Sequence, residues 1–212
     1  MLLAERLVLL DRKLDGSPWA APRPSAELNR WLAASCLVEL AAMGRLSFAA
    51  GMVSSCDELP AHYMLLNDAQ SIVRRRAQSA REAVEAVHRG MPRIAPDLLA
   101  SLVRRGILFE ERTRRLGLFS STRHPVQSTS AYHESARLLR RGAEDLGVQD
   151  LWALGLMLLV DGMGILNALL PDLALDLEKK LHRFETFVSG SRAAADPSAQ
   201  RARLILALTQ LR

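Results

Sequence analysis

Apolar residues recur at helical spacing through most of the chain. Ser25 as an N-cap and Gly44 as a C-cap bound a predicted helix over 26–43. The start of the chain also predicts an amphipathic helix, because four leucines follow one another three or four residues apart: Leu3, Leu7, Leu10 and Leu14. The same pattern predicts further helices at about 63–76, 80–89, 95–105, 131–146, 150–169, 173–188 and 198–211.

Short runs of β-forming residues next to glycines predict two β-hairpins. One hairpin is expected over 45–55. The other is expected over 107–119, with strands at 107–110 and 116–119 that flank a charged turn. The segment 120–130 is rich in Ser and Thr and is expected to be a loop.

The most apolar stretch, Leu151 to Leu170, is 20 residues long, which is about the length needed to cross a bilayer. A central Asp161 would cost roughly 2.5–3.5 kcal/mol on insertion, so a transmembrane segment is not expected. A helix that is apolar all round is otherwise the buried centre of a helical domain. We therefore predict a single mainly α-helical domain over 1–212, with small β-hairpins, built around this buried hydrophobic helix.

Positive charge is concentrated in the middle of the chain. The whole chain carries +5, whereas residues 74–141 hold 15 arginines and six acidic residues, a net charge of +9. This asymmetry is explained either by a solvated helical face or by a surface that binds a polyanion, such as phospholipid or nucleic acid. Arginine outnumbers lysine 25 to 3, which is typical of a GC-rich bacterial genome.

Nothing in the sequence indicates secretion or catalysis. The apolar N-terminus is interrupted by Glu5 and Arg6 and lacks a cleavage-site pattern, so we expect a cytoplasmic protein in which Cys36 and Cys56 are reduced. No two histidines lie three or four residues apart, and the motifs of nucleotide-binding and hydrolytic enzymes are missing. We therefore expect no metal, no cofactor and no enzymatic activity.

A helix followed by a basic hairpin also fits a winged-helix DNA-binding domain. The helix 95–105 and the hairpin 107–119 would place five arginines near phosphates: Arg104, Arg105, Arg112, Arg114 and Arg115. The segment 90–94, which contains Pro92, is a poor turn for a helix-turn-helix. A DNA-binding regulator is one alternative to a lipid-binding protein, and an oligomeric protein–protein interaction module is another.

Three blocks of the sequence, taken in their order along the chain, carry a family resemblance. They are Leu2 to Leu10, Val38 to Leu46, and a longer stretch from Leu102 to Pro125 that contains LVRRGIL, LGLF and TRHP. Together they resemble the Golgi phosphoprotein 3 family. The resemblance implies a compact helical domain around a hydrophobic central helix. It also implies a non-enzymatic, adaptor-type peripheral membrane protein that binds phosphatidylinositol 4-phosphate.

The resemblance also implies positions for a lipid site and for self-association. The family binds its lipid through a tryptophan, a helix arginine and a basic pair, and the matching positions here are Pro24, Ala33, Pro92 and Ala95. The candidate residues for anionic phospholipid or another phosphorylated ligand are therefore nearby ones, namely Trp19 as an interfacial anchor, Arg30, Arg74, Arg75, Arg76, Arg81, Arg89 and Arg93. A homo-oligomer would form through the hairpin at 107–119, which carries Leu116, Leu118 and Phe119. The expected location is the cytoplasm and the inner face of the membrane.

Overall fold

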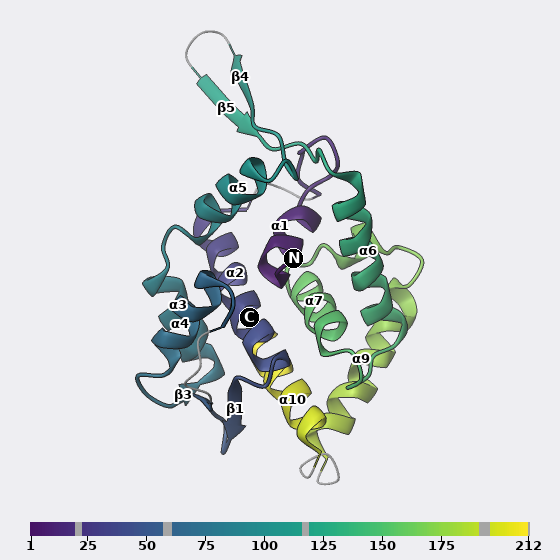
Figure 1. Ribbon diagram of the computed structural model, residues 1–212. Coiled ribbons are helices and arrows are strands. Elements are labelled where there is room, and N and C mark those ends of the chain that lie inside the picture. The colour runs from purple at the N-terminus through teal and green to yellow at the C-terminus, as the bar shows by residue number, and fades with distance from the viewer. Residues whose placement is uncertain (20–22, 57–60, 116–118, 191–195, 212) are drawn as a thin grey trace.

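The computed structural model shows a mainly helical protein, as expected (Figure 1), and describes residues 1–19, 23–56, 61–115, 119–190 and 196–211. Its helices are α1 (Leu3–Leu10), α2 (Ser25–Ala42), α3 (Met64–Val73), α4 (Ala80–Gly90), α5 (Ile94–Arg104), α6 (Thr129–Glu144), α7 (Leu151–Gly162), α8 (Leu166–Leu169), α9 (Ala174–Ser189) and α10 (Pro197–Thr209). Its strands are β1 (Leu46–Ala49), β2 (Met52–Ser55), β3 (Gln78–Ser79), β4 (Glu111–Arg115) and β5 (Phe119–Arg123).

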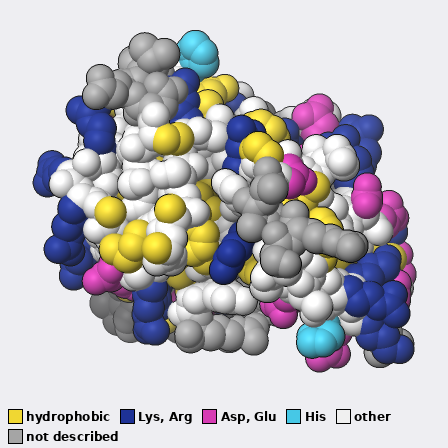
Figure 2. Space-filling model, turned by 90° about the horizontal axis from the view of Figure 1, so that it is seen from below, with side chains coloured by type: hydrophobic (Ala, Val, Ile, Leu, Met, Phe, Trp, Pro, Cys, Tyr) yellow, Lys and Arg dark blue, Asp and Glu magenta, His cyan; other side chains and the backbone are white. Residues whose placement is uncertain are grey.

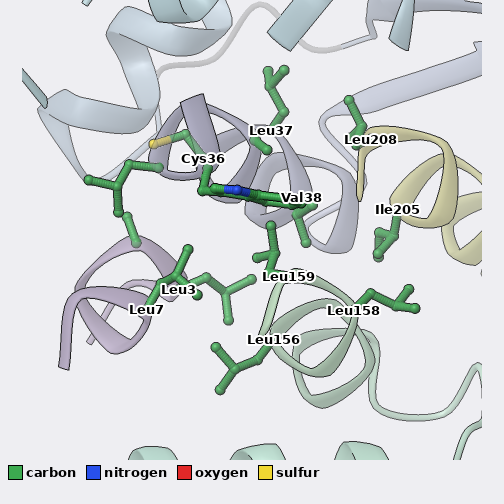
Figure 3. Packing of buried hydrophobic residues seen from close by; sticks show 14 of the residues in the cluster. Leu3, Leu7, Cys36, Leu37, Val38, Leu156, Leu158, Leu159, Ile205 and Leu208 are labelled. Carbon is green, nitrogen blue, oxygen red and sulfur yellow. The ribbon is translucent and has the colours of Figure 1, made fainter. Parts of the chain in front are cut away.

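Helices α2 and α7 form the centre of the core. Every residue of α2 from Trp31 to Ala42 is buried, and α2 contacts α1, α3, α4, α5, α7 and α10. Figure 3 shows leucines of α1, α2 and α7 meeting Ile205 and Leu208 of α10. Each fully buried side chain of this size contributes about 1.5–3 kcal/mol. The prediction of a buried apolar helix is confirmed, and α2 shares the central position with it.

Glycines allow the central helices to approach closely. A Cβ at Gly155 of α7 would lie 2.5 Å from Cγ1 of Val38, and one at Gly142 of α6 would lie 2.2 Å from the carbonyl oxygen of Ala153. Both distances are shorter than any real contact, so only glycine fits at these positions. The glycines that lower the helix propensity of this region therefore permit its packing.

The helix expected over 150–169 is interrupted. Helix α7 ends at Gly162, and Gly164 has a φ of 72°, a conformation that other residues adopt only with strain. A separate short helix, α8, follows. No helix in the described part of the chain is long and apolar enough to cross a membrane. The first helix is also shorter than expected, because α1 ends at Leu10 and Leu14 lies in an exposed turn.

The first predicted hairpin is confirmed, with Leu46 paired to Ser55 and Phe48 to Val53. Strand β3 was not predicted, and it pairs with β2. The predicted strand positions of the second hairpin were wrong. Strand β4 occupies 111–115, where the turn was expected, and most of β5 lies in 120–123, where the loop was expected to begin. This hairpin extends away from the helical body (Figure 1), so its strands need no apolar face. The segment expected as its first strand instead joins α5 to the hairpin, with Leu108 bridged to Val126.

Candidate functional site

The segment from the end of α3 to the end of α4 carries most of the candidate arginines at exposed positions. The buried faces of these helices, which include Leu66 and Val84, pack against α2. Five exposed arginines, which we call the arginine ridge, lie at the C-cap of α3, in the connection that follows it and on α4: Arg74, Arg75, Arg76, Arg81 and Arg89. Figure 2 shows Lys and Arg side chains along the left edge of the molecule, the side on which α3 and α4 lie in Figure 1.

The local structure explains how the ridge is held in place. Helix α3 ends at Val73, and Arg74 occupies its C-cap, where positive charge is favoured by the helix dipole. Strand β3 then anchors the chain to β2, and Ser79 begins α4 with a capping box. Arg81 and Arg89 are eight residues apart on α4, which places them about 12 Å apart along the helix and about 80° apart around its axis.

The charges of the ridge are not neutralised by neighbouring carboxylates. Within the described residues, no ion pair involves any of its five arginines. The nearest acidic residue, Glu82, accepts hydrogen bonds from the backbone and hydroxyl of Ser79 at 2.9 and 2.8 Å. These bonds, with a smaller contribution from Arg76, hold the pKa of Glu82 below its usual range. The ridge therefore presents uncompensated positive charge to the solvent.

Two other candidate arginines do form ion pairs. Arg30 of α2 binds Glu85 of α4 at 2.6 Å, which links the two helices. Arg93 lies 3.7 Å from Asp97, and both side chains are largely exposed, so this pair contributes little to stability. Arg30 is therefore engaged within the protein, whereas Arg93 is accessible.

Trp19 is half-buried against the hydrophobic core, and the ammonium group of Lys13 lies 5.6 Å from its ring centroid. Among the described residues, Tyr63 and Met64 expose large apolar side chains at the start of α3, at 50% and 78%. These two residues were missed by the sequence analysis. The sequence carried no signal for their exposure, because both lie where the apolar stripe of α3 begins.

A groove of about 510 Å³ lies between the start of α3, the α4–α5 turn, α5 and α1. Tyr63, Met64, Met91 and Arg93 line it, together with three carboxylates, those of Glu5, Asp68 and Asp97. Apolar side chains and an accessible arginine therefore share one concave surface at one end of the ridge.

The positions at which the family would bind its lipid contain no basic side chain. Ala33 and Ala95 are buried. The side chain of Asn29 closes the space between α2 and α5, since it donates to the carbonyl of Pro92 at 3.0 Å and accepts from the N–H of Ala95 at 3.2 Å. These positions therefore join two helices, and none of them offers a guanidinium group to a phosphate.

The remaining predicted features are only partly described. Leu116 and Leu118 of the expected oligomerisation hairpin lie outside the described residues, and the side chain of Phe119 is not described either. In the part of the chain that the structure covers, no group of three or more His, Cys, Asp or Glu side chains could hold a metal ion. Cys36 is buried, and Cys56 is exposed.

Comparison with known proteins supports the resemblance of the sequence blocks. A search of curated proteins found no match. The family model for Golgi phosphoprotein 3 (GPP34) matches residues 3–204, which is nearly the whole chain. The match extends from α1 to α10 and includes the ridge, the hairpin and both central helices. The chain therefore belongs to the Golgi phosphoprotein 3 family.

Proposed function

We propose that this protein is a non-enzymatic peripheral membrane protein that binds anionic phospholipid through the arginine ridge. The observation that carries the proposal is the set of five exposed arginines between the end of α3 and the end of α4 that lack ion pairs within the described residues. Each arginine near an anionic membrane surface contributes about 1 kcal/mol, so five together would supply about 5 kcal/mol. That is enough for reversible binding. Membership of the Golgi phosphoprotein 3 family supports the same role.

Tyr63 and Met64 are the apolar contacts that we assign to this surface. They lie at the start of α3, and they line one groove with Arg93. An amphipathic tyrosine is favoured at the level of the lipid headgroups. The partly buried Trp19 is less suited to the anchoring role, because its ring already packs against the core.

Binding would depend on charge rather than on one headgroup. The positions of the family's lipid site are occupied here by Ala33, Pro92 and Ala95, and Asn29 closes that space. Exposed guanidinium groups without a shaped pocket attract any anionic lipid, and salt screens that attraction within about 10 Å at 0.1 M. We therefore expect phosphatidylserine and phosphatidylinositol 4-phosphate to be bound according to their charge density.

Co-sedimentation with vesicles tests the proposal. The protein should bind phosphatidylcholine vesicles only when they also contain phosphatidylserine, and added salt should weaken binding. Replacing Arg74, Arg75 and Arg76 by alanine removes about 3 kcal/mol, which corresponds to a roughly 100-fold weaker partition. The matched control replaces three exposed basic residues on α9 and α10 by alanine: Lys179, Arg183 and Arg203. Equal binding to neutral and anionic vesicles, or equal losses in the two variants, would refute the ridge.

A DNA-binding function is the second candidate, because α4, a three-residue turn, α5 and a basic hairpin follow one another as in a winged helix. The exposed face of α5 includes Pro96, Asp97 and Ala100, which are poor partners for base edges and phosphates. Strand β3 also pairs with β2 rather than with the hairpin. A gel shift on random duplex DNA over a range of salt concentrations separates this function from lipid binding. Light scattering tests the third alternative, an oligomer formed through the hairpin.

A further inference from the structure

A second basic groove lies between α1 and α6. It has a volume of about 500 Å³. Its lining contains four arginines and two glutamates, which together give a net charge of +2: Arg6, Arg137, Arg140, Arg141, Glu134 and Glu144. Helix α6 lies on the right of Figure 1, whereas α3 and α4 lie on the left. The groove is therefore separate from the arginine ridge.

The arginines at the C-terminal end of α6 are held by carboxylates. Arg140 binds Asp172 at 2.9 Å and also lies 3.5 Å from Glu144. Arg141 binds Asp150 at 3.1 Å. These ion pairs connect α6 with the segments before α7 and α9, so they have a clear structural role.

The other two arginines of the groove have no carboxylate partner. Among the residues that the structure describes, Arg137 forms no ion pair, and neither does Arg6. The guanidinium group of Arg6 donates a long hydrogen bond of 3.4 Å to the hydroxyl of Ser135. Each guanidinium group has five N–H donors in a planar fork, so most donors of this pair remain available.

Three arginines of α6 share one face of the helix, and among the described residues only Arg137 of these three lacks a carboxylate partner. Arg137 lies three residues before Arg140 and four before Arg141, and like charges at these spacings repel each other across the helix surface. Glu134 lies on the same face, yet it forms no ion pair with a described residue. A bound anion would offset the positive charge of Arg6 and Arg137, the two arginines of the groove that have no carboxylate partner among the described residues.

The walls of the groove are rigid. Helix α6 is in backbone contact with α7 at Gly142, where a Cβ would lie 2.2 Å from the carbonyl oxygen of Ala153. Ser135 of α6 and most of α1 are fully buried. Because these helices are fixed by core packing, binding a ligand requires little reordering of the backbone.

We propose that this groove binds a phosphate monoester dianion, with Arg6 and Arg137 as the principal donors and Arg141 at the edge. Guanidinium groups pair with phosphate oxygens in a bidentate geometry, and such charge-assisted hydrogen bonds are the strong ones in proteins. The phosphate group comes either from a small phosphorylated molecule or from a monoester headgroup such as that of phosphatidic acid. The proposal does not depend on lipid binding by the ridge.

Isothermal titration calorimetry with inorganic phosphate and with glycerol 3-phosphate tests the site. The wild-type protein should show saturable binding, and Arg137→Gln should weaken it by roughly tenfold or more, because a charge-assisted contact is lost. The matched control is Arg183→Gln, an exposed arginine on α9 that should leave the affinity unchanged. Arg6→Lys keeps the charge and removes the fork, so it should also weaken binding. Thermal unfolding shows whether each variant folds.

Vesicles distinguish the two sources of the phosphate group. They are used with the triple alanine variant of Arg74, Arg75 and Arg76, in which the ridge is weakened. If the protein binds phosphatidic acid vesicles but neither soluble phosphate, and Arg137→Gln weakens that binding, the proposal is supported and a lipid headgroup is the source of the phosphate. Binding of the soluble phosphates that depends on Arg137 supports it with a small molecule as the source. If neither probe binds in a manner that depends on Arg137, the proposal is wrong.

Discussion

Glu39 is a buried carboxylate at the junction of α1 and α2, and its removal should change how stability depends on pH. Its side chain is 7% exposed, and its Oε2 accepts the N–H of Leu3 at 2.7 Å. Glu5 caps the same helix end through the N–H of Leu2 at 2.9 Å and pairs with Arg105. Burial raises the pKa of Glu39 to about 7, although the bond from Leu3 opposes this shift.

The sign of the effect follows from the direction of the shift. A glutamate has a pKa of 4.5 before any shift, so between pH 4.5 and about 7 the folded protein binds more protons than the unfolded chain. The stabilisation linked to protonated Glu39 is therefore fully present below pH 4.5 and is lost as the pH rises through about 7. The difference between these two pKa values corresponds to about 3 kcal/mol. A glutamine at this position cannot ionise, and its carbonyl oxygen can still accept the bond from Leu3.

Urea unfolding at pH 5 and pH 8 measures this linkage. Between the two values, the wild-type protein should lose about 2.5 kcal/mol more of its free energy of unfolding than Glu39→Gln does. The control variant is Glu178→Gln, which changes an exposed glutamate on α9 and should retain the wild-type pH dependence. If Glu39→Gln and the wild-type protein lose the same stability, Glu39 is ionised in the folded state at both pH values and the reasoning fails.

Two further substitutions probe close contacts between helices, and thermal unfolding followed by circular dichroism measures both. Gly142→Ala would place a Cβ 2.2 Å from the carbonyl oxygen of Ala153. The resulting strain of about 1–3 kcal/mol is larger than the gain in helix propensity, so the Tm should fall. An unchanged Tm would show that α6 can move away from α7. Asn29→Ala should cost about 1–3 kcal/mol, because it leaves the N–H of Ala95 buried without its acceptor, whereas Asn29→Asp should restore part of the loss.

The helices could be predicted from the sequence because each buries one face or all of its surface. Apolar spacing and the C-cap at Gly44, which has a φ of 74°, place α2 within a residue or two of its observed bounds. The strand Glu111–Arg115 could not be predicted, since a hairpin that projects into solvent needs no apolar alternation. Leu14 continues the leucine spacing of α1, yet it lies beyond the end of that helix and is 44% exposed.

The sequence predicts which residue types the candidate site contains, but it does not predict which of its arginines form ion pairs. The sequence shows that arginines are dense in one segment, but it does not show that Arg30 binds Glu85, which is 55 residues away and on another helix. Such long-range ion pairs decide which arginines remain available to a ligand. The exposure of Tyr63 and Met64 was also beyond the sequence, because both lie where the apolar stripe of α3 begins.

The net charge of +9 between residues 74 and 141 does not belong to one surface. Arg74–Arg89 lie on the α3–α4 side, Arg112 and Arg123 lie on the projecting hairpin, and Arg137 lies on α6 across the molecule. A flat membrane that contacts the ridge cannot contact the α6 groove, so only the five ridge arginines would contribute, about 5 kcal/mol rather than about 9. A partition energy near the larger value would mean that the protein reorients or that two molecules bind together. The salt dependence of vesicle binding therefore reports how many arginines contact the membrane.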